Sequence, residues 1–163
     1  MEPDIIDKLL AEWRSERSEL DASAMAVVGR VLKLGKILEK KAGLALRDTG
    51  IYYTDLDVLA TLRRSGNPYA LTPTQLMQSV LITSGAMTAL LDRLTKLGLI
   101  YRKPDEKDKR IKRAILTEKG LETINKAIEI RFEEAHDSIS VLTKEEQKEL
   151  AHLLKKLLLS IPD

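Results

Sequence analysis

Residues 71–117 have the sequence LTPTQLMQSVLITSGAMTALLDRLTKLGLIYRKPDEKDKRIKRAILT, which contains clear signals for two helices and two strands. Near its start, Thr72-Pro73-Thr74-Gln75 combines a threonine cap, a proline at the first helical position and a glutamine at the third. We therefore predict a short helix that ends near Ser79. A three-residue turn follows, and Thr83 caps a second helix that ends before Gly98. Two helices joined in this way predict a helix-turn-helix.

After these two helices the spacing of apolar residues is no longer helical. Residues 99–102 and 111–116 are short and rich in β-branched or aromatic side chains, which favours two strands. The loop between them, residues 103–110, is polar and highly charged. Two strands joined by such a loop form a β-hairpin. The hairpin would be the wing of a winged helix-turn-helix.

Helices are also predicted on both sides of this region. Upstream, Thr54 followed by Asp57 resembles a capping box for a helix that ends at Gly66. A leading helix with apolar residues at helical spacing precedes a longer helix over about residues 22–46. Two more amphipathic helices follow Thr117 and Thr143. The fold class is therefore mostly α with a small β-hairpin.

We expect one structural domain with three regions. Residues 1–48 would form N-terminal dimerisation helices, residues 49–117 the winged helix-turn-helix DNA-binding region, and residues 118–163 C-terminal dimerisation helices. The total length of 163 residues suits one compact domain.

Charge is distributed unevenly along the chain. The net charge is +2, but the stretch from Thr83 to Arg113 holds nine cations and four anions, which leaves −3 on the rest. A basic island on an acidic body is typical of a protein that binds a polyanion. A lysine-rich loop that is merely solvated is the alternative.

Several functional classes are disfavoured. The chain has no cysteine, which excludes disulfides and thiol redox sensing. It has no apolar run of membrane-spanning length and no secretion signal, so we expect a cytoplasmic protein. The two histidines, His136 and His152, form no catalytic or zinc-binding pattern, and no glycine-rich phosphate loop is present. We therefore expect no enzyme, no cofactor and no metal site.

The expected DNA contacts follow from the geometry of the motif. The start of the second helix should meet base edges in the major groove, while the wing cations reach phosphates or a minor groove. Asp92 and Asp108 look out of place on such a face, and we expect them to pair with Arg93 or Arg110. The candidate DNA-binding residues are Thr72, Thr83, Ser84, Ala86, Met87, Thr88, Arg93, Lys96, Lys107, Lys109, Arg110 and Lys112.

These stretches resemble the reading head of the MarR family of transcriptional regulators. The matching segments are Leu71-Thr72-Pro73, Thr83 to Thr88, Leu91-Asp92-Arg93-Leu94 and Gly98-Leu99-Ile100, with a wing pattern of Asp105, Asp108, Arg110, Leu116, Thr117 and Gly120. The resemblance spans essentially all 163 residues. It implies a homodimer, usually a repressor, that releases its operator when a small ligand binds.

The N-terminal stretch is similar to one branch of that family. Glu12 to Arg17, with Leu20-Asp21 and Gly29-Arg30, looks like the branch with an extra leading helix, in which some members respond to urate or related aromatic compounds. That branch links the ligand response to a tryptophan, an acid and a recognition-helix arginine. Trp13 and Asp57 match the first two, but Leu90 stands in the place of the arginine.

A small aromatic or heteroaromatic anion is the expected effector. Candidate ligand-binding residues are Trp13, Arg14, Arg17, Arg30 and Asp57. Each has an alternative role. Trp13 could pack the leading helix on the body, Asp57 could belong only to a capping box, and Arg30 could pair with a carboxylate of a partner subunit.

The predicted assembly is a two-fold dimer that reads an inverted repeat. The leucines between Leu150 and Leu158 would form a large exposed patch on a monomer, and a second chain could cover them. A monomer with a helical cap is the alternative assembly. The alternative function is a winged-helix protein-interaction module without specific DNA binding, although its interface core would be expected to carry less charge.

Overall fold

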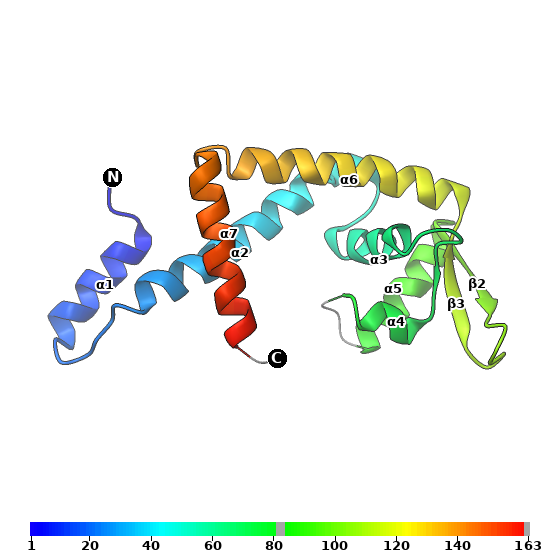
Figure 1. Cartoon of the computed structure of the whole chain (residues 1–163), viewed down its shortest axis with the longest axis horizontal. Coiled ribbons are helices and arrows are strands. Elements are labelled where there is room, and N and C mark those ends of the chain that lie inside the picture. Colours follow the sequence, from blue (N-terminus) through cyan, green and yellow to red (C-terminus); the bar gives the residue numbers. More distant parts are fainter. Residues whose placement is uncertain (81–83, 162–163) are drawn as a thin grey trace. The chain divides into compact units, whose positions relative to one another are not determined.

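The computed structural model of the chain describes residues 1–80 and 84–161 (Figure 1). It divides into two compact units, Met1–Lys41 and Ala42–Asp163, which are described separately. Among the described residues no helix is both long and apolar enough to cross a membrane.

The first unit contains α1 (Ile5–Glu16) and most of α2 (Met25–Ala45). Asp4 caps α1, because its carboxylate accepts hydrogen bonds from the backbone N–H groups of Ile6 and Asp7. Gly29 allows α1 to approach α2 closely, since a Cβ atom there would lie 3.2 Å from the Cδ1 of Ile6. Arg30 of α2 completes the contact by binding the carboxylates of both Asp4 and Asp7.

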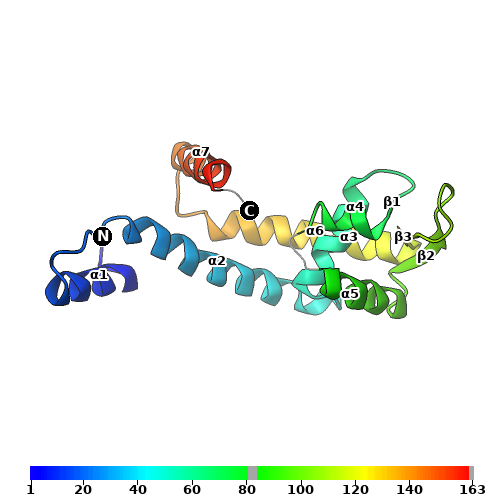
Figure 2. The same ribbon diagram turned by 90° about the horizontal axis from the view of Figure 1, so that it is seen from below.

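The second unit carries the winged helix-turn-helix. After the end of α2 and the short helix η1 (Arg47–Thr49), the elements are α3 (Tyr53–Arg64), β1 (Ala70–Leu71), α4 (Pro73–Met77), α5 (Ser84–Lys96), β2 (Ile100–Pro104), β3 (Lys112–Leu116), α6 (Glu118–Ser138) and α7 (Lys144–Ser160). The hairpin of β2 and β3 projects beyond the helices that carry it (Figures 1 and 2). The predicted fold class and the hairpin are confirmed.

The sheet has one more strand than predicted. Its order is β1-β3-β2, with both pairs antiparallel, and β1 adds only Ala70 and Leu71 opposite Ile115 and Ala114. The hairpin register pairs Tyr101 with Ile115. So short a strand has no alternation of its own, and it is defined only by its long-range partner.

One side of the sheet faces the core. Ile100, Ala114 and Leu116 are buried on this side, together with apolar residues of α3, α4, α5 and α6. Helix α6 begins against the sheet at Gly120, where a Cβ atom would lie only 1.9 Å from the carbonyl oxygen of Leu99. This core holds α5 and the wing in one rigid arrangement.

The start of α3 differs from the predicted capping box. The backbone N–H of Tyr52 donates to the carboxylate of Asp55 at 2.8 Å, so the box begins two residues earlier than the Thr54 and Asp57 pair. Both pairs have the same spacing in sequence. Burial decides between them, since Asp55 is fully buried and Asp57 is only half-buried.

Candidate nucleic-acid interface

The helix pair is built around a buried contact between α4 and α5. Thr72 caps α4 by accepting a hydrogen bond from the backbone N–H of Gln75, whose side chain accepts in return from the N–H of Thr72. Leu76 of α4 and Leu91 and Leu94 of α5 are buried in the core. These contacts fix the direction of α5, the helix that the motif places in the major groove.

The first turn of α5 exposes part of the predicted reading surface. Ala86 and Thr88 are exposed, as a base-contacting face requires. Thr83 lies outside the described residues, and so does the side chain of Ser84. Met87 is corrected: it is 1% exposed and packs in the core, so its side chain cannot face a base edge.

Arg93 on α5 is bound to the body of the protein. Its Nε and Nη2 donate to the carboxylate of Asp55 at 3.0–3.3 Å, and its guanidinium lies 4.2 Å from the centre of the Tyr52 ring. Asp55 is 0% exposed, and these hydrogen bonds raise the pKa of Arg93. The predicted pair of Asp92 with Arg93 is therefore wrong, and Arg93 joins α5 to α3.

Asp92 instead links α5 to the wing. Its carboxylate accepts from Nη1 of Arg102 on β2 at 3.0 Å. The Nε of Arg102 is buried, with no hydrogen-bond partner among the residues that the structure describes. This ion pair connects α5 to the hairpin of β2 and β3. Asp92 therefore has a structural role, although it lies on a face that is expected to contact DNA.

The wing loop is shaped by a second acid. Asp105 is buried and accepts from the backbone N–H groups of Lys107 and Asp108 at 2.8 and 3.1 Å, and from the Nε of Arg113. The two backbone hydrogen bonds, from Asp108 and Lys107, and then the Arg113 guanidinium lower the pKa of Asp105. The loop therefore has a defined conformation that holds the wing tip.

At the wing tip, Asp108 presents Arg110 to solvent. Nε and Nη2 of Arg110 donate to the two carboxylate oxygens at 3.0 and 2.9 Å, and the Arg110 side chain is 90% exposed. The predicted pair of Asp108 and Arg110 is confirmed. The hydrogen bonds lower the pKa of Asp108 and raise that of Arg110, so both stay charged.

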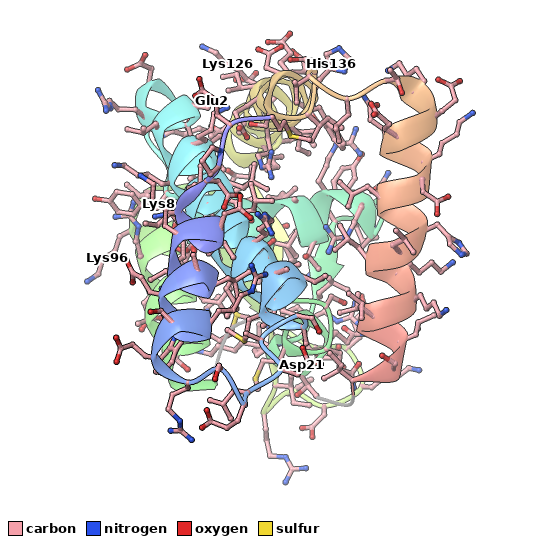
Figure 3. All side chains as sticks on the ribbon, turned by 90° about the vertical axis from the view of Figure 1, so that its left-hand side faces the viewer. Glu2, Lys8, Asp21, Lys96, Lys126 and His136 are labelled. Atoms are coloured by element: carbon pink, nitrogen blue, oxygen red, sulfur yellow. The ribbon has the colours of Figure 1, made fainter. Side chains whose placement is uncertain are left out.

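The remaining predicted cations form an exposed basic surface. None of these four lysines has an ion pair within the part of the chain that the structure describes. The Lys96 side chain extends away from the end of α5 into solvent (Figure 3). The exposed cations of this set are Lys96, Lys107, Lys109 and Lys112.

The candidate ligand residues fall in both units. In the first, Trp13 is 54% exposed and Arg14 and Arg17 are exposed, with Arg17 paired to Glu19. Arg30 binds Asp4 and Asp7 of its own chain, so its carboxylate partners do not have to come from another subunit. In the second unit Asp57 lies on α3, and its role is not that of a capping-box residue.

A pocket lies beside the Arg93 contact. It has a volume of about 310 Å³, and its lining residues are Gly43, Arg47, Gly50, Ile51, Tyr52 and Arg93. An aromatic wall and two cations suit a small aromatic anion. No local sequence pattern indicates this pocket, because its residues come from α2, η1, the segment before α3, and α5.

Comparison with known proteins assigns the chain to a family. The profile of the MarR family matches residues 49–111. The transcriptional regulator PecS of Dickeya dadantii is 32% identical over 152 residues, which cover 93% of this chain and 92% of that protein. The chain belongs to the MarR family. It is a DNA-binding transcriptional regulator with a winged helix-turn-helix, and not an enzyme.

Solved structures of MarR-type regulators share the fold. Sco3205 of Streptomyces coelicolor in complex with DNA has a TM-score of 0.79 at 25% identity, with 88% of this chain and 91% of that chain covered. The organohalide-sensing regulator RdhR-CbdbA1625 bound to 2,4-dichlorophenol has a TM-score of 0.74 at 25% identity, with 85% and 80% covered.

Proposed function

We propose that this MarR-family regulator acts as a homodimeric repressor on an inverted-repeat operator, and that a small aromatic or heteroaromatic anion releases it from DNA. The main support for DNA binding is the conformation of the wing. Buried Asp105 and partly exposed Asp108 fix its loop so that Arg110 and the neighbouring lysines stand free in solvent. Such a preorganised cationic tip matches a phosphate backbone or a minor groove.

In this proposal the residues divide into two groups. Thr72, Ala86, Thr88, Lys96 and the wing cations face DNA, and Thr83 and Ser84 stay in that group as predictions. Arg93 and Arg102 act as positioning residues, because each is bound to an aspartate that ties α5 to another element. DNA affinity then depends on Arg93 only through the orientation of α5.

Support for a homodimer comes from the apolar surface of α6 and α7. Five leucines recur at helical spacing on one face of α7 and are 41–76% exposed in the single chain: Leu150, Leu153, Leu154, Leu157 and Leu158. Phe132 of α6 is also exposed, at 72%. A patch of this kind is covered in a stable protein. A second copy related by a two-fold axis would cover it and also present two reading heads.

Support for an aromatic anion comes from the pocket of Tyr52, Arg47 and Arg93. A bound anion would share Arg93 with Asp55 and so would change how α5 is held. The related regulator RdhR-CbdbA1625 binds 2,4-dichlorophenol, which is a small aromatic compound like the effector proposed here. Trp13 and its neighbouring arginines remain a second predicted part of this response. We also propose that the protein acts in the cytoplasm, because its proposed target is operator DNA.

Selection of bound DNA from a random pool tests the main proposal. The expected result is an inverted repeat whose half-site centres lie about 10 bp apart. An electrophoretic shift at low and high salt should show a strong salt dependence. Binding that is equally weak for all sequences would instead favour a protein-interaction module.

A screen of aromatic acids for operator release tests the effector. An active compound should quench Trp13, the only tryptophan, if Trp13 is a contact. Trp13→Phe should then keep operator affinity but reduce release. If Trp13→Phe unfolds the protein or separates the dimer, Trp13 packs the leading helix instead. Arg47→Ala should reduce release without changing operator affinity in the absence of ligand.

A further inference from the structure

The outer side of the wing sheet forms a groove that shares only Lys107 with the candidate DNA-binding residues. Because side chains alternate along a strand, the residues next to the buried Ile100, Ala114 and Leu116 point the opposite way. This side encloses a volume of about 400 Å³, within the usual range of small-ligand sites. We call it the wing groove. Its lining includes Ala70, Tyr101, Lys103, Arg113 and Ile115.

One end of the wing groove is apolar. Ile115 of the central strand stands between Ala70 of β1 and Tyr101 of β2, because both are its partners in register. Tyr101 is 46% exposed although it is a large aromatic residue. Three side chains in a row across three strands make a flat surface that matches one face of a planar ring.

The other end is cationic. Lys103 and Arg113 are direct cross-strand partners, and Lys107 reaches the same groove from the loop. Arg113 uses its Nε for Asp105, and its terminal N–H groups have no partner within residues 1–80 and 84–161. A carboxylate between Lys103 and Arg113 would therefore find free donors on both sides.

The balance of charge selects a monoanion. Asp105 also lines the groove, but the Arg113 guanidinium already neutralises its charge, and two backbone N–H groups donate hydrogen bonds to it. Glu106 opposes one of the two lysines, so a single positive charge remains. The second negative charge of a dianion would be repelled by Glu106, without a cation to match it.

From these observations we infer that the wing groove binds a planar aromatic monocarboxylate, with its ring on Tyr101, Ile115 and Ala70 and its carboxylate between Lys103 and Arg113. This site is separate from the pocket at Tyr52 and Arg47. The link to operator affinity rests on the proposed DNA-binding function of the wing. An anion bound beside Lys107 neutralises part of the wing charge and so weakens phosphate binding. By linkage, operator DNA weakens ligand binding by the same factor.

Naphthoate is a suitable probe for the full-length protein. Its binding is followed by calorimetry and by the amide chemical shifts of residues 101 and 115. Lys103→Ala should raise the Kd of naphthoate about tenfold, since one charge-assisted hydrogen bond is lost. Tyr101→Ala should raise it similarly, and it removes apolar contact without changing charge. Lys109→Ala is the matched control, because it removes the same charge from the wing outside the groove.

The outcomes separate the two proposals. Shifts at residues 101 and 115 that saturate, and that weaken with Lys103→Ala but not with Lys109→Ala, support the wing groove. Naphthoate that shifts only residues around Arg47, or equal effects of both lysine variants, would overturn it. A Lys103→Ala protein that loses operator affinity but keeps naphthoate affinity would also overturn it, since the groove would then contact DNA. Operator binding without naphthoate, measured on the same samples, tests the DNA-binding function independently.

Discussion

Four aspartates of the winged helix-turn-helix each hold one arginine, and the surroundings of each pair decide its role. The pairs are Asp55–Arg93, Asp92–Arg102, Asp105–Arg113 and Asp108–Arg110. In the first pair the acid is fully buried, so the arginine is drawn to the protein. In the last pair the arginine is 90% exposed, so the acid only orients it toward solvent. The same two residue types therefore have opposite roles in the first and the last pair.

Replacing Arg110 by Ala should weaken operator binding. Arg110 stands at the wing tip with its guanidinium already oriented by Asp108. If it contacts a phosphate, the slope of log affinity against log salt should become about one unit less steep. If it enters a minor groove, the loss should depend on A·T content. Fluorescence anisotropy with labelled operator at several salt concentrations measures both. Thermal stability should not change, and unaltered affinity at low and physiological salt would exclude this contact.

Replacing Arg93 by Ala should destabilise the protein. The change leaves the buried Asp55 carboxylate without its guanidinium partner and removes the stacking on Tyr52. We expect the free energy of unfolding to fall by about 1–3 kcal/mol, less than for a fully buried pair because Arg93 is itself 37% exposed. Urea denaturation measures this loss.

A conservative variant separates this role from DNA contact. Arg93→Lys keeps the charge but cannot form the two-oxygen contact or the flat stack. If Arg93 positions α5, Arg93→Lys should also lose stability. If Arg93 contacts phosphate, Arg93→Lys should instead keep stability and most of the operator affinity.

At the scale of elements, local signals predicted most of the fold. The cap and proline at Thr72 and Pro73 defined the start of α4, and Gly98 marked the end of α5, because these signals act on the backbone of their own helix. Strand β1 and the Asp55–Arg93 contact could not be predicted. Both depend on partners about 40 residues away in sequence, and neither has a local pattern that requires them.

The wrong prediction at Met87 had a different cause, because the pattern that decides it is local. Met87 has small or hydroxyl-bearing neighbours and was grouped with them, but helical periodicity turns it inward among the core leucines. The wing was better predicted, because the pair of Asp108 and Arg110 is only two residues apart. The wing groove required the strand register, which the sequence did not define.

The contact between α1 and α2 should weaken in acid. A backbone hydrogen bond from Asp7 and the Arg30 guanidinium lower the pKa of Asp4, and Arg30 chiefly lowers that of Asp7. Because both pKa values lie below the ordinary value of 3.8, this stabilisation is complete above that pH. It should be lost as the pH falls through the lowered values. Hydrogen exchange of α1 between pH 5 and pH 2 measures the change, with these limits chosen about the ordinary aspartate pKa.

Arg30→Ala tests the cause of this dependence. It should speed exchange in α1 at neutral pH and flatten the dependence on pH, because the two carboxylates lose their partner. Arg14→Ala is the control, since Arg14 is an exposed arginine of α1 with no ion pair among the described residues. Equal exchange in Arg30→Ala and the unaltered protein would show that other contacts hold α1.

In the whole molecule, DNA binding by the winged helix-turn-helix is linked to association of the chains through their apolar helices. A single head contacts only one half-site, and its affinity would be modest at physiological salt. The exposed apolar side chains of α6 and α7 supply a reason for two chains to associate. Association then couples two heads on one DNA molecule, which raises the affinity without any new contact to DNA.

Replacing Leu158 by Glu should therefore separate the chains and weaken operator binding together. Leu158 is 76% exposed on the last turns of α7, so the change should leave the fold of a single chain intact but place a charge in the dimer contact. Sedimentation equilibrium should show an increased dissociation constant, and operator affinity should fall toward that of one half-site. Lys155→Glu on the same helix is the control for charge, because a cation there already faces solvent. A Leu158→Glu protein that stays dimeric and binds the inverted repeat normally would place the dimer contact elsewhere on the chain.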